Sequence, residues 1–178
     1  MLIETIFSGF GGQGVLSMGK LLAYAAMKEG KEISWMPSYG PEMRGGTANC
    51  MVNISDEPIS SPVVTEYDVV VALNQPSLKK FEPQVKKGGI LIWESSTIKE
   101  GPTRTDIKIY ALPAVDKATN VLKNVKVMNM LVLGALMKVK AIVKKETLLE
   151  VLKETLPERH HHLIPLNEKA IELGMSLV

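Results

Sequence analysis

The stretch that most constrains this chain is Ser8-Gly9-Phe10-Gly11-Gly12-Gln13-Gly14, because it joins a strand-like run to a helix-like run. Residues 2–7 are rich in Ile and Phe, as in a buried strand, and residues 15–28 repeat apolar side chains at helical spacing. Gly9, Gly11 and Gly14 fit the spacing G-x-G-x-x-G, in which bare backbone approaches a ligand and the first N–H groups of the helix face an anion. The stretch therefore predicts a strand, loop and helix that hold a phosphate-like group.

A glycine loop at such a junction has a second interpretation, since glycines also occur wherever a strand turns sharply into a helix. A nicotinamide-binding site further requires an acidic residue at the end of the second strand, where it holds the ribose hydroxyls. The second strand is predicted at 32–36, with Glu32 at its beginning and Glu42 only in the following loop. We therefore expect a relative of the dinucleotide folds without the nicotinamide contact. A stand-alone nucleotide- or flavin-binding reductase and a purely structural subunit are the alternatives.

The length and composition predict one domain over residues 1–178, since 178 residues with 46% hydrophobic content can bury a sizeable core. The 21 basic and 19 acidic residues are scattered, which argues against a nucleic-acid partner. The single cysteine, Cys50, excludes an internal disulfide and a four-cysteine cluster and favours a reducing compartment. No signal-peptide pattern opens the chain, and the apolar stretch 130–137 is far shorter than the ~20 residues that cross a bilayer. We expect a cytoplasmic protein with no membrane partner.

The order of patterns predicts a Rossmann-like open sheet, mostly parallel with one or two antiparallel strands, and helices on both faces. The run 47–54 alternates apolar and polar residues after a loop too short for a crossover helix, so we expect it to be antiparallel. The run 67–73 reads as a central parallel strand. Further strands are predicted at 90–93 and 107–112, and helices from Pro76 through Val85, at 114–122, from an N-cap at Asn129 to Val139, at 146–156, and from Pro165 to a stop at Gly174.

Ligands of such sheets lie outside the carboxyl ends of the strands, near the point where the strand order reverses. Four polar or glycine-rich segments follow predicted strands, and we interpret them as one surface, although any of their Asn and Ser residues could instead cap a helix or make a turn. The candidate binding residues are Gly9, Gly11, Gly12, Gln13, Gly14, Ser38, Tyr39, Glu42, Arg44, Gly45, Asn74, Ser95 and Ser96.

Arg44 lies among glycines beside this predicted surface, where its guanidinium could hold a phosphate or a partner's carboxylate bidentately. The alternative is an internal ion pair with Glu42 or Glu66. No catalytic or metal-binding set is assigned: Cys50 reads as a small core residue, and residues 160–162, three histidines, as a solvated connector with metal binding a remote second. The helix containing 130–137 reads as core, with a subunit-facing surface as the alternative.

Several motifs resemble the gamma subunit of 2-oxoacid:ferredoxin oxidoreductases. They are Gly11-Gly12-Gln13-Gly14 after the first strand, the loop 37–46 and the segment 56–62. Segments 129–134 and 166–170 are also similar to that family, so the likeness covers nearly the whole chain. The sequence Pro-Glu-Met-Arg-Gly-Gly at 41–46 looks most like the 2-oxoglutarate branch.

The resemblance implies a share in converting a 2-oxoacid and coenzyme A to an acyl-CoA and CO2, with electrons passed to ferredoxin. It implies that thiamine diphosphate and iron–sulfur clusters are held by partner alpha and beta subunits, and by a ferredoxin-like delta subunit where one is present. The chain is then inactive alone and contributes a Rossmann-like wall with part of the coenzyme A site. A homodimer contact is also expected.

Overall fold

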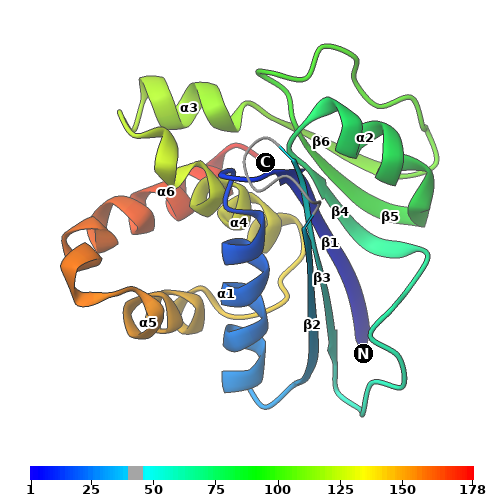
Figure 1. Cartoon of the computed structure of the whole chain (residues 1–178), viewed down its shortest axis with the longest axis horizontal. Coiled ribbons are helices and arrows are strands. Elements are labelled where there is room, and N and C mark those ends of the chain that lie inside the picture. The colour runs from blue at the N-terminus through cyan, green and yellow to red at the C-terminus, as the bar shows by residue number, and fades with distance from the viewer. Residues whose placement is uncertain (40–45) are drawn as a thin grey trace.

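The computed structural model describes residues 1–39 and 46–178 and is built on a six-stranded sheet (Figure 1). The strands lie in the order β2-β3-β1-β4-β5-β6. They are β1 (Leu2–Phe10), β2 (Glu32–Tyr39), β3 (Thr47–Ser55), β4 (Tyr67–Ala72), β5 (Val85–Glu94) and β6 (Lys108–Leu112). The pairs β1–β4, β4–β5 and β5–β6 are parallel. Strand β3 runs antiparallel to both of its neighbours, β1 and β2. The predicted fold class is confirmed.

Helices cover both faces of this sheet (Figure 1). The α-helices are α1 (Val15–Lys28), α2 (Gln75–Phe81), α3 (Ala114–Asn120), α4 (Met128–Val139), α5 (Lys145–Thr155) and α6 (Ile164–Ser176). Three short 3-10 helices accompany them: η1 (Glu82–Gln84), η2 (Val125–Val127) and η3 (Glu158–Leu163). α2 packs on one face, and the other α-helices pack on the opposite face.

Strand β4 separates two cores. Val69 and Val71 point to the core beneath α1 and α4, whereas Val70 and Ala72 point to the core beneath α2. Successive side chains of a strand alternate between faces, so a strand covered on both sides needs apolar residues at every position. This explains the unbroken apolar run from Val69 and confirms that β4 is a central parallel strand.

Helix α4 is almost wholly buried and crosses α6 at very short range. A Cβ added to Gly134 would overlap the carbonyl oxygen of Ile171, and one added to Gly174 would overlap that of Leu131. The two glycines therefore let the helix backbones touch, and the apolar segment 130–137 is core, as expected. The prediction that Gly174 ends the last helix was wrong: it lies inside α6, where close packing requires it.

Two other predicted helix boundaries were also wrong. Val85 begins β5 and is not part of the helix after Pro76, because η1 with its proline ends α2 first. Asn129 is not an N-cap but the second residue of α4, which follows η2 directly. The capping role belongs to Asn124, whose side chain accepts a hydrogen bond from the N–H of Lys126 at 3.0 Å.

Strand β2 is longer than predicted and runs through Pro37 to Tyr39. Proline is tolerated because β2 is the edge strand of the described sheet, where one side of the backbone needs no partner. The predicted end of α1 is confirmed, since Gly30 adopts a φ of 77° and its N–H bonds the carbonyl oxygen of Met27 at 3.0 Å.

Candidate functional site

The strand order reverses between β1 and β4. From β1 the chain crosses through α1 to β2 on one side of the sheet, whereas β4, β5 and β6 lie on the other side. The helices that follow β1 and β4 also lie on opposite faces. A crevice at such a point is where open α/β sheets bind ligands. We call the place where the glycine loop, residues 9–14, meets the segment from Leu73 to Gln75 the crevice.

The side chain of Gln13 spans this crevice. Its Oε1 accepts a hydrogen bond from the N–H of Phe10 at 2.6 Å, and its Nε2 donates to the carbonyl oxygen of Leu73 at 3.0 Å. The amide thus joins β1 to the end of β4 just where the two strands separate. A Cβ on Gly9 would lie 2.6 Å from Gln13 Oε1, so the absence of a side chain at Gly9 makes room for this bridge.

The backbone N–H groups of the glycine loop fall into two sets. Those of Phe10, Gly11 and Gln13 are bonded internally, to Gln13 Oε1, the carbonyl of Gly46 and the carbonyl of Phe10. Those of Gly12, Gly14 and Val15 have no hydrogen-bond partner within residues 1–39 and 46–178. The open donors therefore belong to the second half of the loop and the start of α1.

The start of α1 has the electrostatic character of an anion site. Its first turn holds no acidic residue, and within the described chain no side chain caps it. No described residue thus compensates the partial positive charge of the helix N-terminus. Gly12 and Gly14 turn the loop with φ of 95° and 75°, and Gly14 packs against Asn129, which a Cβ would approach to 2.5 Å.

Asn74, at the end of β4, both caps a helix and offers a donor. Its Oδ1 accepts from the N–H of Ser77 at 2.8 Å, while its Nδ2 is buried without a partner among the residues described. A buried amide nitrogen without a partner is costly, so this group is a candidate for a ligand contact at the crevice. Sequence reasoning missed Ser8, whose buried hydroxyl donates to Asn49 Oδ1 and lies 2.7 Å from Ser77 Oγ.

The predicted residues of the second strand lie to one side of the crevice. Ser38 and Tyr39 end β2, two strands away from β1, and Tyr39 is 60% exposed. Glu42, Arg44 and Gly45 fall outside the residues that the structure describes. Gly46, the residue before β3, lies against the glycine loop, since its carbonyl oxygen accepts the N–H of Gly11 at 3.0 Å.

The hydroxyl-rich segment after β5 surrounds a buried carboxylate. Glu94, 1% exposed, accepts hydrogen bonds from the N–H and hydroxyl groups of Ser96 and Thr97 and from the N–H of Val115 at 3.1 Å. Burial acts to raise the pKa of the Glu94 carboxyl, but these hydrogen bonds outweigh it and the pKa is lowered. Ser96 therefore serves the junction of β5 and α3, and the N–H of Ser95 bonds the carbonyl of Leu112.

Cys50 is a core residue, as expected. It lies buried against Gly19 of α1, and burial raises the pKa of its thiol to about 12, so it is not a reactive thiolate. Among residues 1–39 and 46–178 no cluster of three potential metal ligands occurs. In the same residues, no helix has the length and apolar character needed to cross a lipid bilayer.

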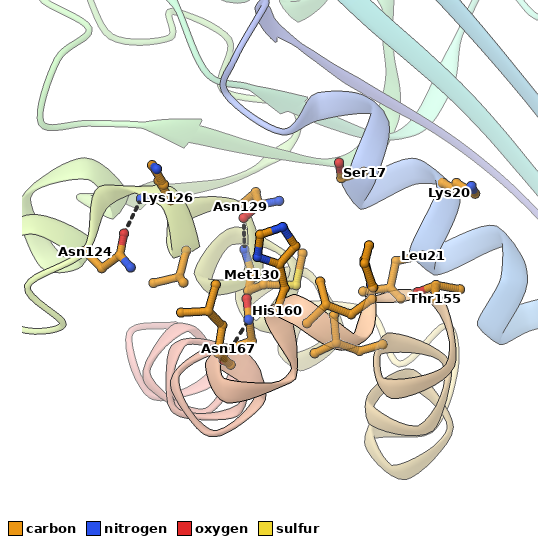
Figure 2. Close-up of a pocket in the computed structure, with 15 residues that line it drawn as sticks. Ser17, Lys20, Leu21, Asn124, Lys126, Asn129, Met130, Thr155, His160 and Asn167 are labelled. Atoms are coloured by element: carbon orange, nitrogen blue, oxygen red, sulfur yellow. Dashed lines mark hydrogen bonds between the residues drawn. The ribbon is translucent and has the colours of Figure 1, made fainter.

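A cavity of about 450 Å³ lies beside the glycine loop, between α1 and the other helices of its layer (Figure 2). Figure 2 shows Asn129, Met130 and His160 near its centre, with Lys20 on α1 and Lys126 on η2 at its borders. The prediction that residues 160–162 form a solvated connector is thus partly confirmed. His161 and His162 are exposed, but His160 is half-buried and lines the cavity. The only signal for this cavity in the sequence was the polar face of α1, which includes Ser17 and Lys20.

A sequence model described as pyruvate ferredoxin/flavodoxin oxidoreductase matches residues 4–177. The chain belongs to this family. It is 40% identical over 97% of its length to the ketoisovalerate oxidoreductase subunit VorA of Methanothermobacter thermautotrophicus, of which it covers 35%. It is 35% identical over 87% of its length to the 2-oxoglutarate synthase subunit KorC of Methanocaldococcus jannaschii, of which it covers 84%.

The fold of this chain also agrees with that of a solved structure. The crystal structure of the keto/oxoacid ferredoxin oxidoreductase gamma subunit from Geobacter sulfurreducens superposes with a TM-score of 0.83 at 31% identity, covering 98% of this chain and 96% of that one. The chain thus corresponds in extent to a gamma subunit, and it spans about a third of VorA. The resemblance to the gamma subunit of 2-oxoacid:ferredoxin oxidoreductases is confirmed.

Proposed function

We propose that this family member works as the gamma subunit of a 2-oxoacid:ferredoxin oxidoreductase complex and forms part of its coenzyme A site. The complex would convert a 2-oxoacid, coenzyme A and oxidised ferredoxin to an acyl-CoA, CO2 and reduced ferredoxin. The observation that carries the proposal is the set of open N–H groups on Gly12, Gly14 and Val15 at the uncapped start of α1. Coenzyme A has a pyrophosphate, which is the kind of anion that such a helix start binds.

The remaining candidate residues have distinct parts in this proposal. Gln13 fixes the loop through its bridge to Leu73, and Gly9 and Gly11 allow the loop its shape. Asn74 has a buried Nδ2 without a partner in the described chain, and we assign it a contact to the bound cosubstrate. Arg44, with Glu42 and Gly45, would approach from the connection after Ser38 and Tyr39, where a guanidinium suits a phosphate.

The redox groups of the reaction do not fit this chain. The one cysteine of the sequence, Cys50, is buried with a raised pKa, and an iron–sulfur cluster needs several thiolates. As the resemblance to the family implies, we assign thiamine diphosphate and the clusters to alpha and beta subunits, and to a ferredoxin-like delta subunit where one is present. We also assign the choice of 2-oxoacid to those partners, because the names of the relatives include both ketoisovalerate and 2-oxoglutarate. A homodimer contact stays a prediction.

The direct test is to purify the tagged chain from its native cell with whatever co-purifies, and to compare it with the chain expressed alone. The complex should contain thiamine diphosphate and iron and reduce a viologen dye with a 2-oxoacid only when coenzyme A is present. The chain alone should contain neither group and turn over nothing. Oxidation of a 2-oxoacid by the chain alone would refute the proposal, as would a redox-active flavin bound to it.

A further inference from the structure

We propose that the 450 Å³ cavity of Figure 2 binds a small amphipathic anion, a carboxylate or phosphate head group that carries an aliphatic chain. The cavity lies within the helical layer, between α1, α4, α5, α6 and the short helices η2 and η3. Its size falls within the range of about 300–1,000 Å³ found for small-molecule sites. None of residues 9–14 lines it, so the inference does not depend on the coenzyme A proposal.

The polar part of the lining favours a negative charge. Lys20 and Lys126 line the cavity at its borders, no aspartate or glutamate is among its lining residues, and neither lysine forms an ion pair within residues 1–39 and 46–178. Both side chains are exposed, and the Lys20 ammonium lies 5.4 Å from the centre of the Tyr24 ring. Two lysines at the rim, with no acid in the lining, produce a positive potential there that an anion neutralises.

An amide side chain adds a neutral donor to this charge. The Oδ1 atoms of Asn124 and Asn129 accept the N–H groups of Lys126 and Met130, each at 3.0 Å. The Nδ2 of Asn129 lies against Gly14, whereas the Nδ2 of Asn124 makes no hydrogen bond within residues 1–39 and 46–178 and is left to donate to a ligand. N–H donors together with ammonium groups match the oxygens of a carboxylate or a phosphate.

The apolar part of the lining accounts for the chain of the ligand. It consists of side chains from α1, η2, α4, α5 and the segment around η3, namely Leu21, Val127, Met130, Leu152, Leu156 and Leu163. Leu21, Met130 and Leu152 are buried among the residues described and continue into the main core. Aliphatic walls of this kind bind methylene groups, and each buried methylene should tighten binding roughly fourfold.

The test uses the full chain and isothermal titration with sodium octanoate, n-octyl phosphate, sodium butyrate and neutral 1-octanol. We expect one site per chain, binding of octanoate or octyl phosphate that is at least tenfold tighter than that of octanol, and weaker binding of butyrate. The tighter of the two eight-carbon anions identifies the head group. In the double variant Lys20→Met and Lys126→Met, affinity for the anion should fall at least tenfold, whereas Lys138→Met, an exposed lysine outside the cavity, should leave it unchanged.

Three results with the isolated chain would overturn the inference. The first is no anion binding at millimolar concentration, and the second is octanol binding as tightly as the anions. The third is equal affinity in the double variant and the wild type, with circular dichroism showing both folded. The titration is repeated on the assembled complex, where retained binding supports a small-molecule site. Loss of binding there, with cross-links from a partner subunit to Lys20 or Lys126, would show that the cavity is covered by protein instead.

Discussion

The bridge made by Gln13 gives a quantitative prediction. Gln13→Ala removes two hydrogen bonds, one from the N–H of Phe10 and one to the carbonyl of Leu73. At about 1 kcal/mol each, the free energy of unfolding should fall by about 2 kcal/mol. For a chain of this size the midpoint of thermal unfolding should then fall by about 4–8 °C, measured by circular dichroism.

Gln75 provides a matched control. Its amide also makes two bonds, to the carbonyl and from the N–H of Glu100, both at 2.9 Å. Both of these are exposed, so water replaces them, whereas the bond of Gln13 to Leu73 is partly buried. Gln75→Ala should therefore cost at most about 1 kcal/mol. In the assembled complex, Gln13→Ala should raise the KM for coenzyme A by about tenfold, because the glycine loop loses its anchor, and Gln75→Ala should not.

A second substitution separates the two bonds. Gln13→Glu keeps an acceptor for the N–H of Phe10 but places an oxygen opposite the carbonyl oxygen of Leu73 in place of the donor. It should destabilise the chain at least as much as Gln13→Ala. Equal thermal midpoints for wild type and Gln13→Ala would refute the reasoning that this amide holds β1 and β4 together at the crevice.

Three further predictions concern the fold. Gly134→Ala should lower the free energy of unfolding by about 1–3 kcal/mol in chemical denaturation, because the added Cβ overlaps α6. Gly101→Ala, where a Cβ has room, should change it by less than about 0.5 kcal/mol. Similar values for both variants would contradict the close crossing of α4 and α6. Folding lowers the pKa of Glu94, so the ionised carboxylate stabilises the folded chain fully above the ordinary pKa of 4.5, and this stabilisation is lost as the pH falls through the folded pKa. Glu94→Gln should flatten this acid dependence of the free energy of unfolding in a pH series of denaturation curves. An unchanged series would refute the role of the carboxylate. Cys50 should not react with a thiol reagent at pH 8 until the chain is unfolded, since its thiol is buried with a pKa of about 12, and rapid labelling of the native chain would contradict that environment.

The fold was predictable because its signals are local. Alternation in residues 47–54 predicted the reversed strand, and the apolar run from Tyr67 predicted a central one. The wrong boundaries arose where tertiary packing decides. Gly174 has the position of a helix stop, yet it is needed for contact with Leu131, a residue 43 positions earlier that no local pattern reveals.

The candidate site was predictable in place but not in detail. The glycine spacing located the crevice at β1, but it did not reveal that Gln13 reaches across to Leu73. It also did not show that Ser96 is engaged by Glu94. Capping of a helix by Asn74 was the open alternative, and the structure shows that Asn74 caps α2. Such partners are separated along the chain and depend on side-chain geometry. The cavity lined by Asn129 and His160 was missed because its walls come from several helices.

Gly12 tests the central claim most directly, and Gly30 is its matched control. Both glycines have positive φ, 95° and 77°, and neither has an atom of residues 1–39 or 46–178 within 4 Å of an added Cβ, so an alanine strains both backbones. Only Gly12 lies where the pyrophosphate of coenzyme A would approach the start of α1. In the assembled complex, Gly12→Ala should raise the KM for coenzyme A about tenfold and leave the KM for the 2-oxoacid unchanged, while Gly30→Ala changes neither. A KM for coenzyme A that is the same in wild type and both variants would contradict the claim that this loop holds the cosubstrate.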